Sequence, residues 1–275
     1  MDDELNIKYE NLKNYLRETK KAAVAFSFGV DSTFLLDVCF EVLKNNVLAI
    51  IVLSNSFPDR ESKGAIDFCK KKNINYEIIK FNEFEIEEYK NNPINRCYLC
   101  KKEMFKKIKS KAFEYDIKNI LEGSNTDDMK DYRPGLKALL ELEILSPLKE
   151  AKLNKEEIRI LSKERNLKTF NKPSFACLAT RISYGDEITK EKLKMIEKAE
   201  QILYNLGFCQ FRVRLKEKDA RIEILEDEFE KLIENKTRKR IMEEFKKIGF
   251  EYISLDLEGY RQGSQNLKIK GNFTP

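Results

Sequence analysis

Residues 21–36 have the sequence KAAVAFSFGVDSTFLL, which combines a strand, a turn and a helix. Residues 22–26 are a short apolar run typical of a buried strand, residues 27–32 form a polar turn, and the pattern becomes helical from Thr33. The first N–H groups of a helix lack partners within it and lie at the positive end of its dipole. Gly29 lets the backbone approach a ligand, and Ser27 and Ser32 add hydroxyl donors. The stretch therefore predicts a phosphate site.

Two common nucleotide-binding motifs are absent from this turn, and their absence limits the classes of enzyme to which it can belong. Neither GxxxxGK[ST] nor GxGxxG occurs, which argues against ordinary P-loop kinases and against dinucleotide binding. The turn resembles the SGGxDS loop of the PP-loop ATPases, which split ATP between its α and β phosphates. Ser27, Gly29, Asp31 and Ser32 match that loop, whereas Phe28 stands where the family usually has glycine. The alternative is an ordinary helix start with a polar cap at Asp31 or Ser32.

Strands alternate with helices through the first two thirds of the chain. Apolar runs at 47–53, 76–79 and 119–121 predict strands, and the first of these is a continuous run typical of a parallel strand covered on both faces. Helices are predicted between and around them, at residues 5–16, 33–43, 58–72 and 155–165, and a basic helix is predicted to follow residues 96–101 and to end near residue 115. This order predicts an α/β fold with a doubly wound parallel sheet, whose ligands bind at the carboxyl ends of the strands.

The pattern changes near residue 186. Residues 189–206 and 227–247 are predicted as helices, residues 210–215 and 221–225 alternate with period two, and residues 252–257 form a further strand. We therefore expect two domains, an ATP-binding domain over residues 1–185 and a smaller α+β domain over residues 186–275 for substrate binding and oligomerisation.

The amino-acid composition limits the kinds of partner that the protein is expected to bind. Of 275 residues, 41% are hydrophobic and 36% are charged, as in globular proteins. The 52 basic and 47 acidic residues are interspersed, so the net charge of +5 is expected to be a solvated face and not a nucleic-acid track. The longest apolar run, 47–53, is too short to span a bilayer, and the acidic start lacks a signal-peptide core. We expect a cytoplasmic protein that binds neither nucleic acid nor membrane.

The sequence contains no histidine and six unevenly spaced cysteines. Without histidine, Ser-His and Cys-His dyads are excluded, and any metal must be held by cysteine or oxygen ligands. Cys39 and Cys69 fall within predicted helices and Cys209 beside a strand, where a free cysteine is usually a small hydrophobic residue.

Cys97 and Cys100 form a CxxC pair, and Cys177 follows far downstream. Three thiolates would suit a [4Fe–4S] cluster with one open iron that binds a small ligand such as sulfide. Zinc with a water or carboxylate as its fourth ligand, a redox pair, or no metal are the alternatives that the spacing leaves open.

Two further groups could contact phosphate or its metal. Asp127 and Asp128 follow a predicted strand and could hold Mg²⁺, although paired aspartates in a turn are more often helix caps. Arg212 and Arg214 share one face of a strand by the period-two rule, which makes joint binding of an anion feasible. The alternative for any single arginine is a surface charge.

Taken together, these motifs resemble the LarE family, the ATP-dependent sulfur transferases of nickel-pincer nucleotide synthesis. The similarity covers nearly the whole chain and is carried by FSFGVDS (26–32), NPINRCYLCK (92–101), GSNTDD (123–128), DYRPG (131–135), SPL (146–148), KPSFACLATRISYG (172–185), FRVRLKEKDARIEI (211–224) and LDLEGYRQGSQN (255–266).

The resemblance implies that ATP adenylates a carboxylate of pyridinium-3,5-biscarboxylate mononucleotide and that sulfur then displaces AMP. It implies ATP and Mg²⁺ sites at Ser27, Gly29, Val30, Asp31, Ser32, Ser54, Asp127 and Asp128. Arg212 and Arg214 would bind the substrate phosphate, and Arg181, Asp131 and Arg133 match positions near the site. Members of the family form homo-oligomers.

Cys177 matches the sulfur-donating cysteine of the family. In one branch this cysteine gives up its own sulfur and becomes dehydroalanine. In another branch three cysteines hold a [4Fe–4S] cluster that carries sulfide, and the presence of Cys97 and Cys100 places this chain with the second branch. Sulfide or another sulfur donor is then a co-substrate.

Two rival functions remain. A tRNA thiolase would use the same loop but predicts zinc knuckles or a basic extension, neither of which the sequence contains. A non-catalytic nucleotide-binding module or sulfur carrier would bind nucleotide without releasing pyrophosphate, and the unusual Phe28 favours it.

Overall fold

The computed structural model describes residues 3–130, 134–173, 176–261 and 263. The chain divides into two compact units, one made of residues 1–86 and 95–174 and the other of residues 87–94 and 175–275. The domain boundary expected after residue 185 stays a prediction, which limited proteolysis would test. Within the described residues, no helix is both long and apolar enough to cross a membrane.

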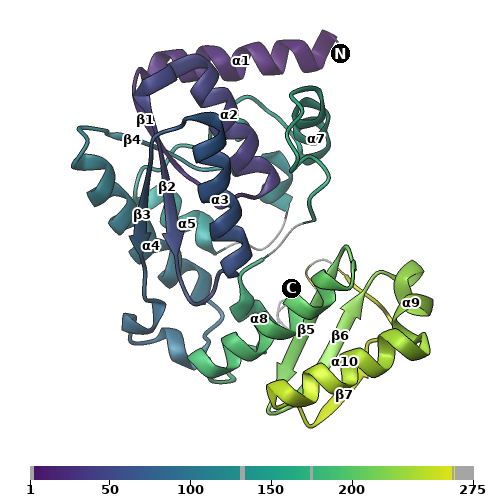
Figure 1. Ribbon diagram of the computed structural model, residues 1–275. Helices are drawn as coiled ribbons and strands as arrows, with labels where there is room; N and C mark the ends of the chain where they lie inside the picture. Colours follow the sequence, from purple (N-terminus) through teal and green to yellow (C-terminus); the bar gives the residue numbers. More distant parts are fainter. Residues whose placement is uncertain (1–2, 131–133, 174–175, 262, 264–275) are drawn as a thin grey trace, which may run out of the picture. The chain divides into compact units, whose positions relative to one another are not determined.

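The first unit contains a parallel sheet, as the alternating pattern predicted (Figure 1). Its four strands are β1 (Ala22–Ala25), β2 (Val47–Leu53), β3 (Tyr76–Lys80) and β4 (Asn119–Leu121), in the order β3-β2-β1-β4. Leu145 extends the sheet beyond β4 by a parallel bridge to Leu121. The chain steps outward from β1 to β3 and then returns to the other side of β1, so the direction of winding reverses between β1 and β4.

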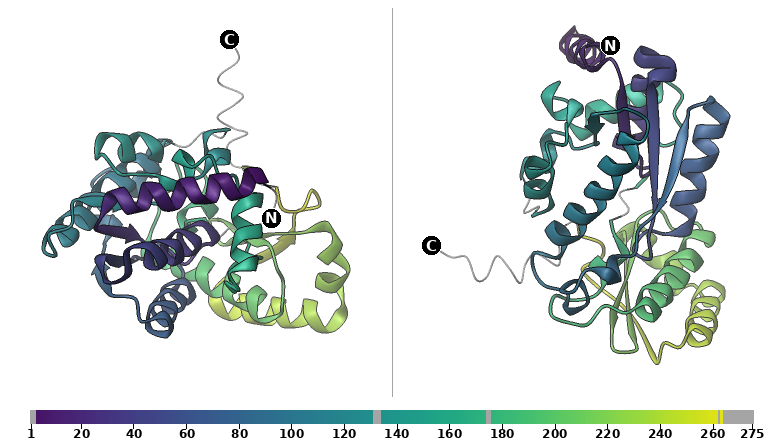
Figure 2. Two further views of the ribbon diagram at one scale, coloured as in Figure 1. Left: turned by 90° about the horizontal axis from the view of Figure 1, so that it is seen from above. Right: turned by 90° about the vertical axis from the view of Figure 1, so that its left-hand side faces the viewer.

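Helices cover both faces of this sheet, as the right-hand view of Figure 2 shows. One buried cluster joins the sheet to α1 (Asp3–Thr19), α2 (Val30–Leu43), α3 (Asp59–Lys72) and α7 (Lys155–Glu164). The other joins it to α4 (Arg96–Phe113) and α5 (Gly135–Glu141), while the short α6 (Pro147–Glu150) follows α5. Val47, Ala49 and Ile51 of β2 belong to the first cluster, and Leu48 and Ile50 belong to the second. Because side chains alternate across a strand, a strand covered on both faces must be apolar throughout.

The helix after β1 begins earlier than predicted. It starts at Val30 and not at Thr33, because Gly29 adopts the extended conformation of an N-cap residue, with φ −75° and ψ 169°. Asp31 and Ser32 therefore lie in the first turn of α2, where backbone N–H groups lack intrahelical partners.

The second unit contains the predicted α+β elements. Its sheet has the order β5-β6-β7, made of β5 (Phe211–Lys216), β6 (Asp219–Ile224) and β7 (Tyr252–Leu255), with β5 and β6 antiparallel. Its helices are α8 (Lys190–Asn205), α9 (Phe229–Ile233) and α10 (Asn235–Ile248). The prediction of a single helix over residues 227–247 was wrong, because Glu234 adopts an extended backbone with ψ 134° and divides it.

Residues 87–94 belong to the second unit although they lie within the sequence of the first. The backbone N–H groups of Gly185 and Ile188 donate to the carbonyl groups of Asn92 and Lys90 at 3.0 and 2.8 Å. The buried Asn92 side chain also donates to the carbonyl of Ser183 at 2.6 Å. Short 3₁₀ segments complete the chain at Lys44–Asn46, Glu83–Glu85, Tyr89–Asn91, Thr126–Lys130, Leu178–Arg181 and Glu226–Glu228.

Candidate active site

The predicted phosphate loop joins β1 to α2. The hydroxyl oxygens of Ser27 and Ser32 lie 3.1 Å apart, and the Ser32 hydroxyl donates to the carbonyl of Gly29 at 3.4 Å. Gly29, the N-cap residue, has no side chain that could accept from the N–H groups of the first turn. Such a turn, at the carboxyl end of a parallel strand, can receive an anion such as a phosphate.

The loop after β4 packs directly on this helix start. A Cβ atom at Gly123 would lie 3.0 Å from the backbone nitrogen of Ser32, so a larger residue would push the two segments apart by a few tenths of an ångström. The Asn125 side-chain amide donates to Oδ1 of Asp31 at 3.2 Å. The GSNTDD segment therefore lies beside the phosphate loop, as expected for loops that follow adjacent strands.

Lys155 is a site residue that the sequence analysis missed. Its ammonium group forms an ion pair with Oδ2 of Asp31, and its backbone N–H donates to Oδ2 of Asp127 at 3.0 Å. Lys155 is the first residue of α7, where the helix dipole disfavours a cation and favours the acidic side chains of Glu156 and Glu157. A lysine at that position was the signal that could have identified it.

The two aspartates proposed for Mg²⁺ make turn and cap contacts. Asp127 accepts from the first N–H of α7, and Oδ2 of Asp128 accepts from the backbone N–H of Asn125 at 3.1 Å. Asp31 differs from them because its carboxylate lies in the first turn of α2 with 23% of the side chain exposed. Carboxylate oxygens suit Mg²⁺, so Asp31 is the best placed of the three for an ion that also binds phosphate. Asp131 and Arg133 lie outside the described residues.

Phe28 adopts a backbone conformation that favours glycine. Its φ is +59°, in the left-handed region that bulky residues rarely enter. Its ring contacts Phe26 edge-on at a centroid distance of 6.2 Å, and Phe68 at 6.3 Å. Glycine could adopt this φ without steric cost, so the loop backbone follows a path that is open to the residue usual in the family.

Ser54 follows β2 at the same edge of the sheet. Its hydroxyl accepts from the backbone N–H of Ser56 at 3.1 Å and donates to Glu83 at 3.4 Å. Glu83 is fully buried, and the Ser56 hydroxyl also donates to it at 2.5 Å. This buried carboxylate orders the end of β2, and no sequence motif indicated it.

The cysteines differ in their surroundings, and none of the six forms a disulfide. Cys39 and Cys69 are buried in α2 and α3, as predicted, and burial raises the pKa of the Cys69 thiol to about 12. Cys209 is exposed, so its prediction as a small hydrophobic residue was wrong. Burial makes the first two poor metal ligands, because a metal binds the thiolate.

Cys97 and Cys100 lie near the start of α4 and are partly exposed. Residues three apart lie on one face of a helix, so the two thiols form a pair of adjacent soft ligands that suits iron or zinc. Cys177 belongs to the other unit, just before the turn Leu178–Arg181. Across the described part of the chain, no three cysteine or carboxylate side chains come together as a metal-binding group.

Arg181 orders the backbone around Cys177. Its guanidinium forms a buried ion pair with Glu200, with Nε 2.7 Å from Oε1, and neither side chain is exposed. The same guanidinium donates to the carbonyl of Cys177 at 3.2 Å and to that of Ala176 at 3.0 Å. Arg181 therefore positions the segment that carries the thiol.

Arg212 and Arg214 lie on one face of β5, as predicted, and extend this charge cluster. Arg214 donates two hydrogen bonds of 2.8 Å to the buried Glu223, and one of 2.6 Å to the carbonyl of Thr180. Arg212 lies over the Tyr260 ring at 4.9 Å and donates to the carbonyl of Phe211. Burial, reinforced by the charge of Arg181, lowers the pKa of Arg212 to about 10, so it remains charged at neutral pH.

The cluster of Arg181, Arg212, Arg214, Glu200 and Glu223 has more positive than negative groups, and its members are largely buried. A buried excess of positive charge favours an anionic ligand.

We expect Glu200→Gln to destabilise the second unit by about 3 to 5 kcal/mol, because it leaves the buried charge of Arg181 without its partner. Burial opposes ionisation of Glu200, but Arg181 holds the pKa of this carboxyl below its ordinary value. The ion pair between Glu200 and Arg181 therefore stabilises the folded protein fully at pH values above the pKa that Glu200 has in the unfolded chain. This stabilisation is lost as the pH falls through the lower pKa that Glu200 has in the folded protein. Urea unfolding followed by tyrosine fluorescence at pH 7 and at acidic pH would measure it.

Glu251→Gln is the matched control for this prediction. Glu251 pairs with Lys218 on the surface, with 57% of its side chain exposed, so its loss should cost less than about 1 kcal/mol. Equal unfolding midpoints for the two variants would contradict a buried, stabilising Glu200.

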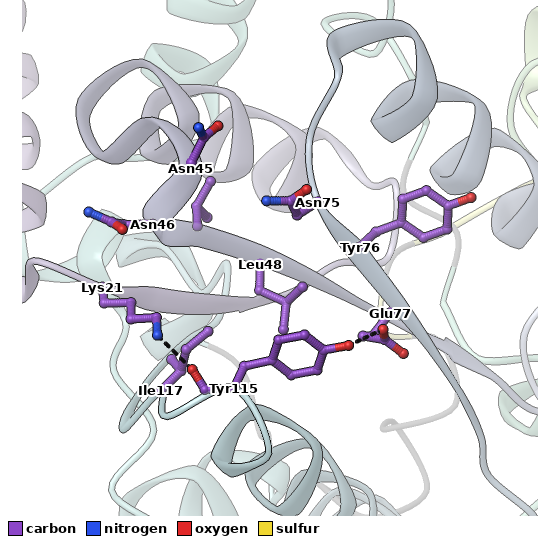
Figure 3. Close-up of a pocket in the computed structure, with 10 residues that line it drawn as sticks. Lys21, Asn45, Asn46, Leu48, Asn75, Tyr76, Glu77, Tyr115 and Ile117 are labelled. Carbon is purple, nitrogen blue, oxygen red and sulfur yellow. Dashed lines mark hydrogen bonds between the residues drawn. The ribbon is translucent and has the colours of Figure 1, made fainter.

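A separate hollow of about 420 Å³ lies at the opposite edge of the parallel sheet (Figure 3). It is lined by residues at the amino ends of the strands, including Lys21, Val47 and Tyr76. Lys21 donates to the carbonyl of Tyr115, whose hydroxyl donates to Glu77. Because ligands of doubly wound sheets bind at the carboxyl edge, this hollow is not the candidate active site.

Known proteins resemble the chain over nearly its whole length. The NAD synthase family model matches residues 4–122. Pyridinium-3,5-bisthiocarboxylic acid mononucleotide synthase of Lactiplantibacillus plantarum is 32% identical over 253 residues, which cover 91% of each chain. The uncharacterized protein slr1717 of Synechocystis is 37% identical and covers 95% of this chain and 98% of the relative. The uncharacterized protein MJ0830 of Methanocaldococcus jannaschii is 36% identical and covers 91% and 96%.

The parallel sheet with its phosphate loop agrees with the similarity to the synthase, and that similarity covers 91% of the chain and so extends over both units. The chain belongs to the LarE family of ATP-dependent sulfurtransferases, within the PP-loop ATPases.

Proposed function

We propose that the protein uses ATP to adenylate a carboxylate of pyridinium-3,5-biscarboxylate mononucleotide and then exchanges an oxygen of that carboxylate for sulfur. The observation that carries this proposal is the phosphate loop, with Asp31 at its helix start, in a chain 32% identical to a bisthiocarboxylic acid mononucleotide synthase. The physiological partners would be this small mononucleotide and a sulfur donor such as sulfide, in the cytoplasm. A homo-oligomer is proposed by analogy with the family.

The first step forms an acyl-adenylate. A carboxylate oxygen of the substrate attacks the α-phosphorus of ATP, and pyrophosphate leaves. Ser27, Gly29, Val30 and Ser32 would bind the phosphates through hydroxyl and N–H groups, and Ser54 lies at the same edge of the sheet. Asp31 would hold Mg²⁺, with Asp127 or Asp128 nearby. Lys155 and the helix start would meet the negative charge that builds up on the phosphates, and a bound Mg²⁺ would supply further positive charge.

The second step replaces AMP by sulfur. A sulfur nucleophile attacks the adenylated carbonyl carbon, and AMP leaves with its oxygen, so the product is a thiocarboxylate. No histidine is required, because sulfide or thiolate is already deprotonated. Arg181 would keep the backbone of Cys177 in place during transfer, because it binds the carbonyl of Cys177.

Cys97, Cys100 and Cys177 would hold a [4Fe–4S] cluster that supplies a site for sulfide on its open iron. This proposal is supported by the adjacent, partly exposed thiols of Cys97 and Cys100 on α4. If Cys177 instead gave up its own sulfur, the other two cysteines would have no role in the reaction.

Product analysis tests the proposal. Protein purified without oxygen would be incubated with ATP, Mg²⁺, sulfide and the biscarboxylate mononucleotide, and the nucleotides would be separated by chromatography. We expect AMP and pyrophosphate in equal amounts and a thiocarboxylate product. Formation of ADP would overturn the loop assignment, and thiolation of tRNA in place of the mononucleotide would support the tRNA thiolase.

We expect Arg212→Ala and Arg214→Ala each to raise the KM for the mononucleotide about ten- to a hundredfold, the effect of one charge-assisted hydrogen bond to phosphate. The KM for ATP should change little, because the phosphate loop that is assigned to ATP remains unchanged. Initial rates at varied concentrations of each substrate would measure both constants.

Arg221→Ala is the control. Arg221 lies opposite Arg214 on the neighbouring strand β6, but 55% of its side chain is exposed. Because Arg214 also forms an ion pair with the buried Glu223, the Arg214→Ala variant must first be shown to be folded. A double variant with unchanged substrate affinity would remove both residues from the phosphate site.

A further inference from the structure

We infer that Lys172 is a positioning residue that holds the phosphate loop in its binding conformation by fixing Phe28. This inference rests on the proposed function, since it concerns the same ATP site. It starts from the one position at which the loop departs from the PP-loop pattern.

Phe28 requires external support. Glycine enters the left-handed region at no steric cost, whereas a residue with a Cβ atom is disfavoured there. Phe28 nevertheless has φ +59°. A strained backbone conformation persists only where the surrounding structure holds it in place. The contacts of Phe28 must therefore offset a steric cost that glycine would not have.

Lys172 makes two of these contacts with a single ammonium group. Its Nζ atom donates to the carbonyl oxygen of Phe28 at 2.8 Å and lies 4.0 Å from the centroid of the Phe28 ring. The same group pairs with Glu61 at 2.5 Å, and only 18% of the lysine side chain is exposed. A charged donor and a cation–π contact therefore act on the backbone and the ring of one residue.

The backbone of Lys172 is itself fixed. Arg159 of α7 donates to the carbonyl of Lys172 at 2.9 Å and to that of Phe170 at 2.5 Å. The backbone from which the Lys172 side chain extends is thus fixed, which restricts where its ammonium group can lie. This is what distinguishes a positioning contact from that of a mobile surface lysine.

The ring of Phe28 occupies a space that Gly64 provides. A Cβ atom at Gly64 of α3 would lie 2.2 Å from the ring, so any larger residue there would displace it. Gly64 is an internal helix residue, where glycine is usually unfavourable compared with alanine. Its presence is explained by the ring that it accommodates.

The contact with Lys172 orients a donor for phosphate. In a trans peptide the carbonyl oxygen of Phe28 and the N–H of Gly29 point in opposite directions, and the described chain contains no cis peptide. Binding of the carbonyl to Lys172 therefore turns the N–H of Gly29 to the other side of the peptide. Backbone N–H groups at such a loop are the donors that bind phosphate.

The test compares Lys172→Met, Lys172→Arg and the double variant Phe28→Gly/Lys172→Met. Calorimetry would measure the Kd for Mg²⁺ and α,β-methylene-ATP, which binds without reacting. We expect Lys172→Met to weaken binding about ten- to a hundredfold, the effect of one charge-assisted hydrogen bond, and Lys172→Arg to restore most of it. The double variant should bind more tightly than Lys172→Met, because glycine adopts the left-handed conformation unaided.

Lys71→Met, which changes an exposed lysine of α3, is the control and should bind like the wild type. The KM for the mononucleotide should stay unchanged in the Lys172 variants, whereas general loss of folding would affect both substrates. Wild-type affinity in folded Lys172→Met, or a double variant no tighter than the single one, would overturn the inference. A wild-type protein that binds the analogue but forms no AMP would contradict the proposed function instead.

Discussion

Asp31→Ala is expected to reduce the rate of AMP formation by about a hundredfold or more, because it removes a charged group that acts on the reacting phosphates. Asp31 lies in the first turn of α2, held by Asn125 and paired with Lys155. Its carboxylate is the metal ligand in the proposed reaction, so the loss should appear in kcat. The measurement is AMP release at saturating ATP and substrate.

Binding of ATP should change much less than the rate. Without Asp31, Lys155 loses its carboxylate partner and can pair fully with phosphate, which offsets part of the lost metal binding. Asp31→Asn would show whether charge or shape matters, and Asp67→Ala, an exposed aspartate of α3, is the control. An Asp31→Ala variant with nearly wild-type kcat would remove this residue from the reaction.

Cys177→Ala is expected to abolish sulfur transfer while leaving adenylation intact, because the residues assigned to adenylation belong to the phosphate loop, which this substitution does not change. Exchange of labelled pyrophosphate into ATP, with the mononucleotide present, would report adenylation alone. The thiocarboxylate product would be measured by mass spectrometry. Cys209→Ala, which removes an exposed thiol from the same unit, should leave both reactions unchanged.

The companion variants distinguish the two sources of sulfur. If a cluster is used, Cys97→Ala and Cys100→Ala should also stop transfer and remove the visible absorbance of protein purified without oxygen. The mass of the wild-type chain should then be unchanged after turnover with sulfide. Loss of the mass of H₂S, with dehydroalanine at position 177, would show that Cys177 gives up its own sulfur.

The fold could be predicted from sequence because its signals are local. The apolar run over Val47–Leu53 coincides with β2, and the run before Ser27 ends in the loop that its residues predicted. The same locality explains the errors: propensity did not reveal the break at Glu234, where helix formers continue on both sides.

The supporting residues of the site could not be predicted in this way. Lys155 and Lys172 reach the phosphate loop from positions 124 and 144 residues further along the chain. Lys172 would be taken for a surface charge from sequence alone, and only the unfavourable position of Lys155 at a helix start indicates a role for it. The association of residues 87–94 with the second unit is equally hidden in the sequence, because it depends on backbone hydrogen bonds, which almost any residue can make, and on the one buried side chain of Asn92.

The strand order also sets the time at which the site can form during synthesis. Residue 22 pairs with residue 47 on one side of β1 but with residue 119 on the other. Closing the longer loop costs only about 1 kcal/mol more, yet it requires a much longer nascent chain. Until β4 emerges, β1 is an unpaired edge that can join other chains, and neither Asn125 nor Lys155 is present to support Asp31. ATP can therefore stabilise the folded protein only after more than half of the chain has been made.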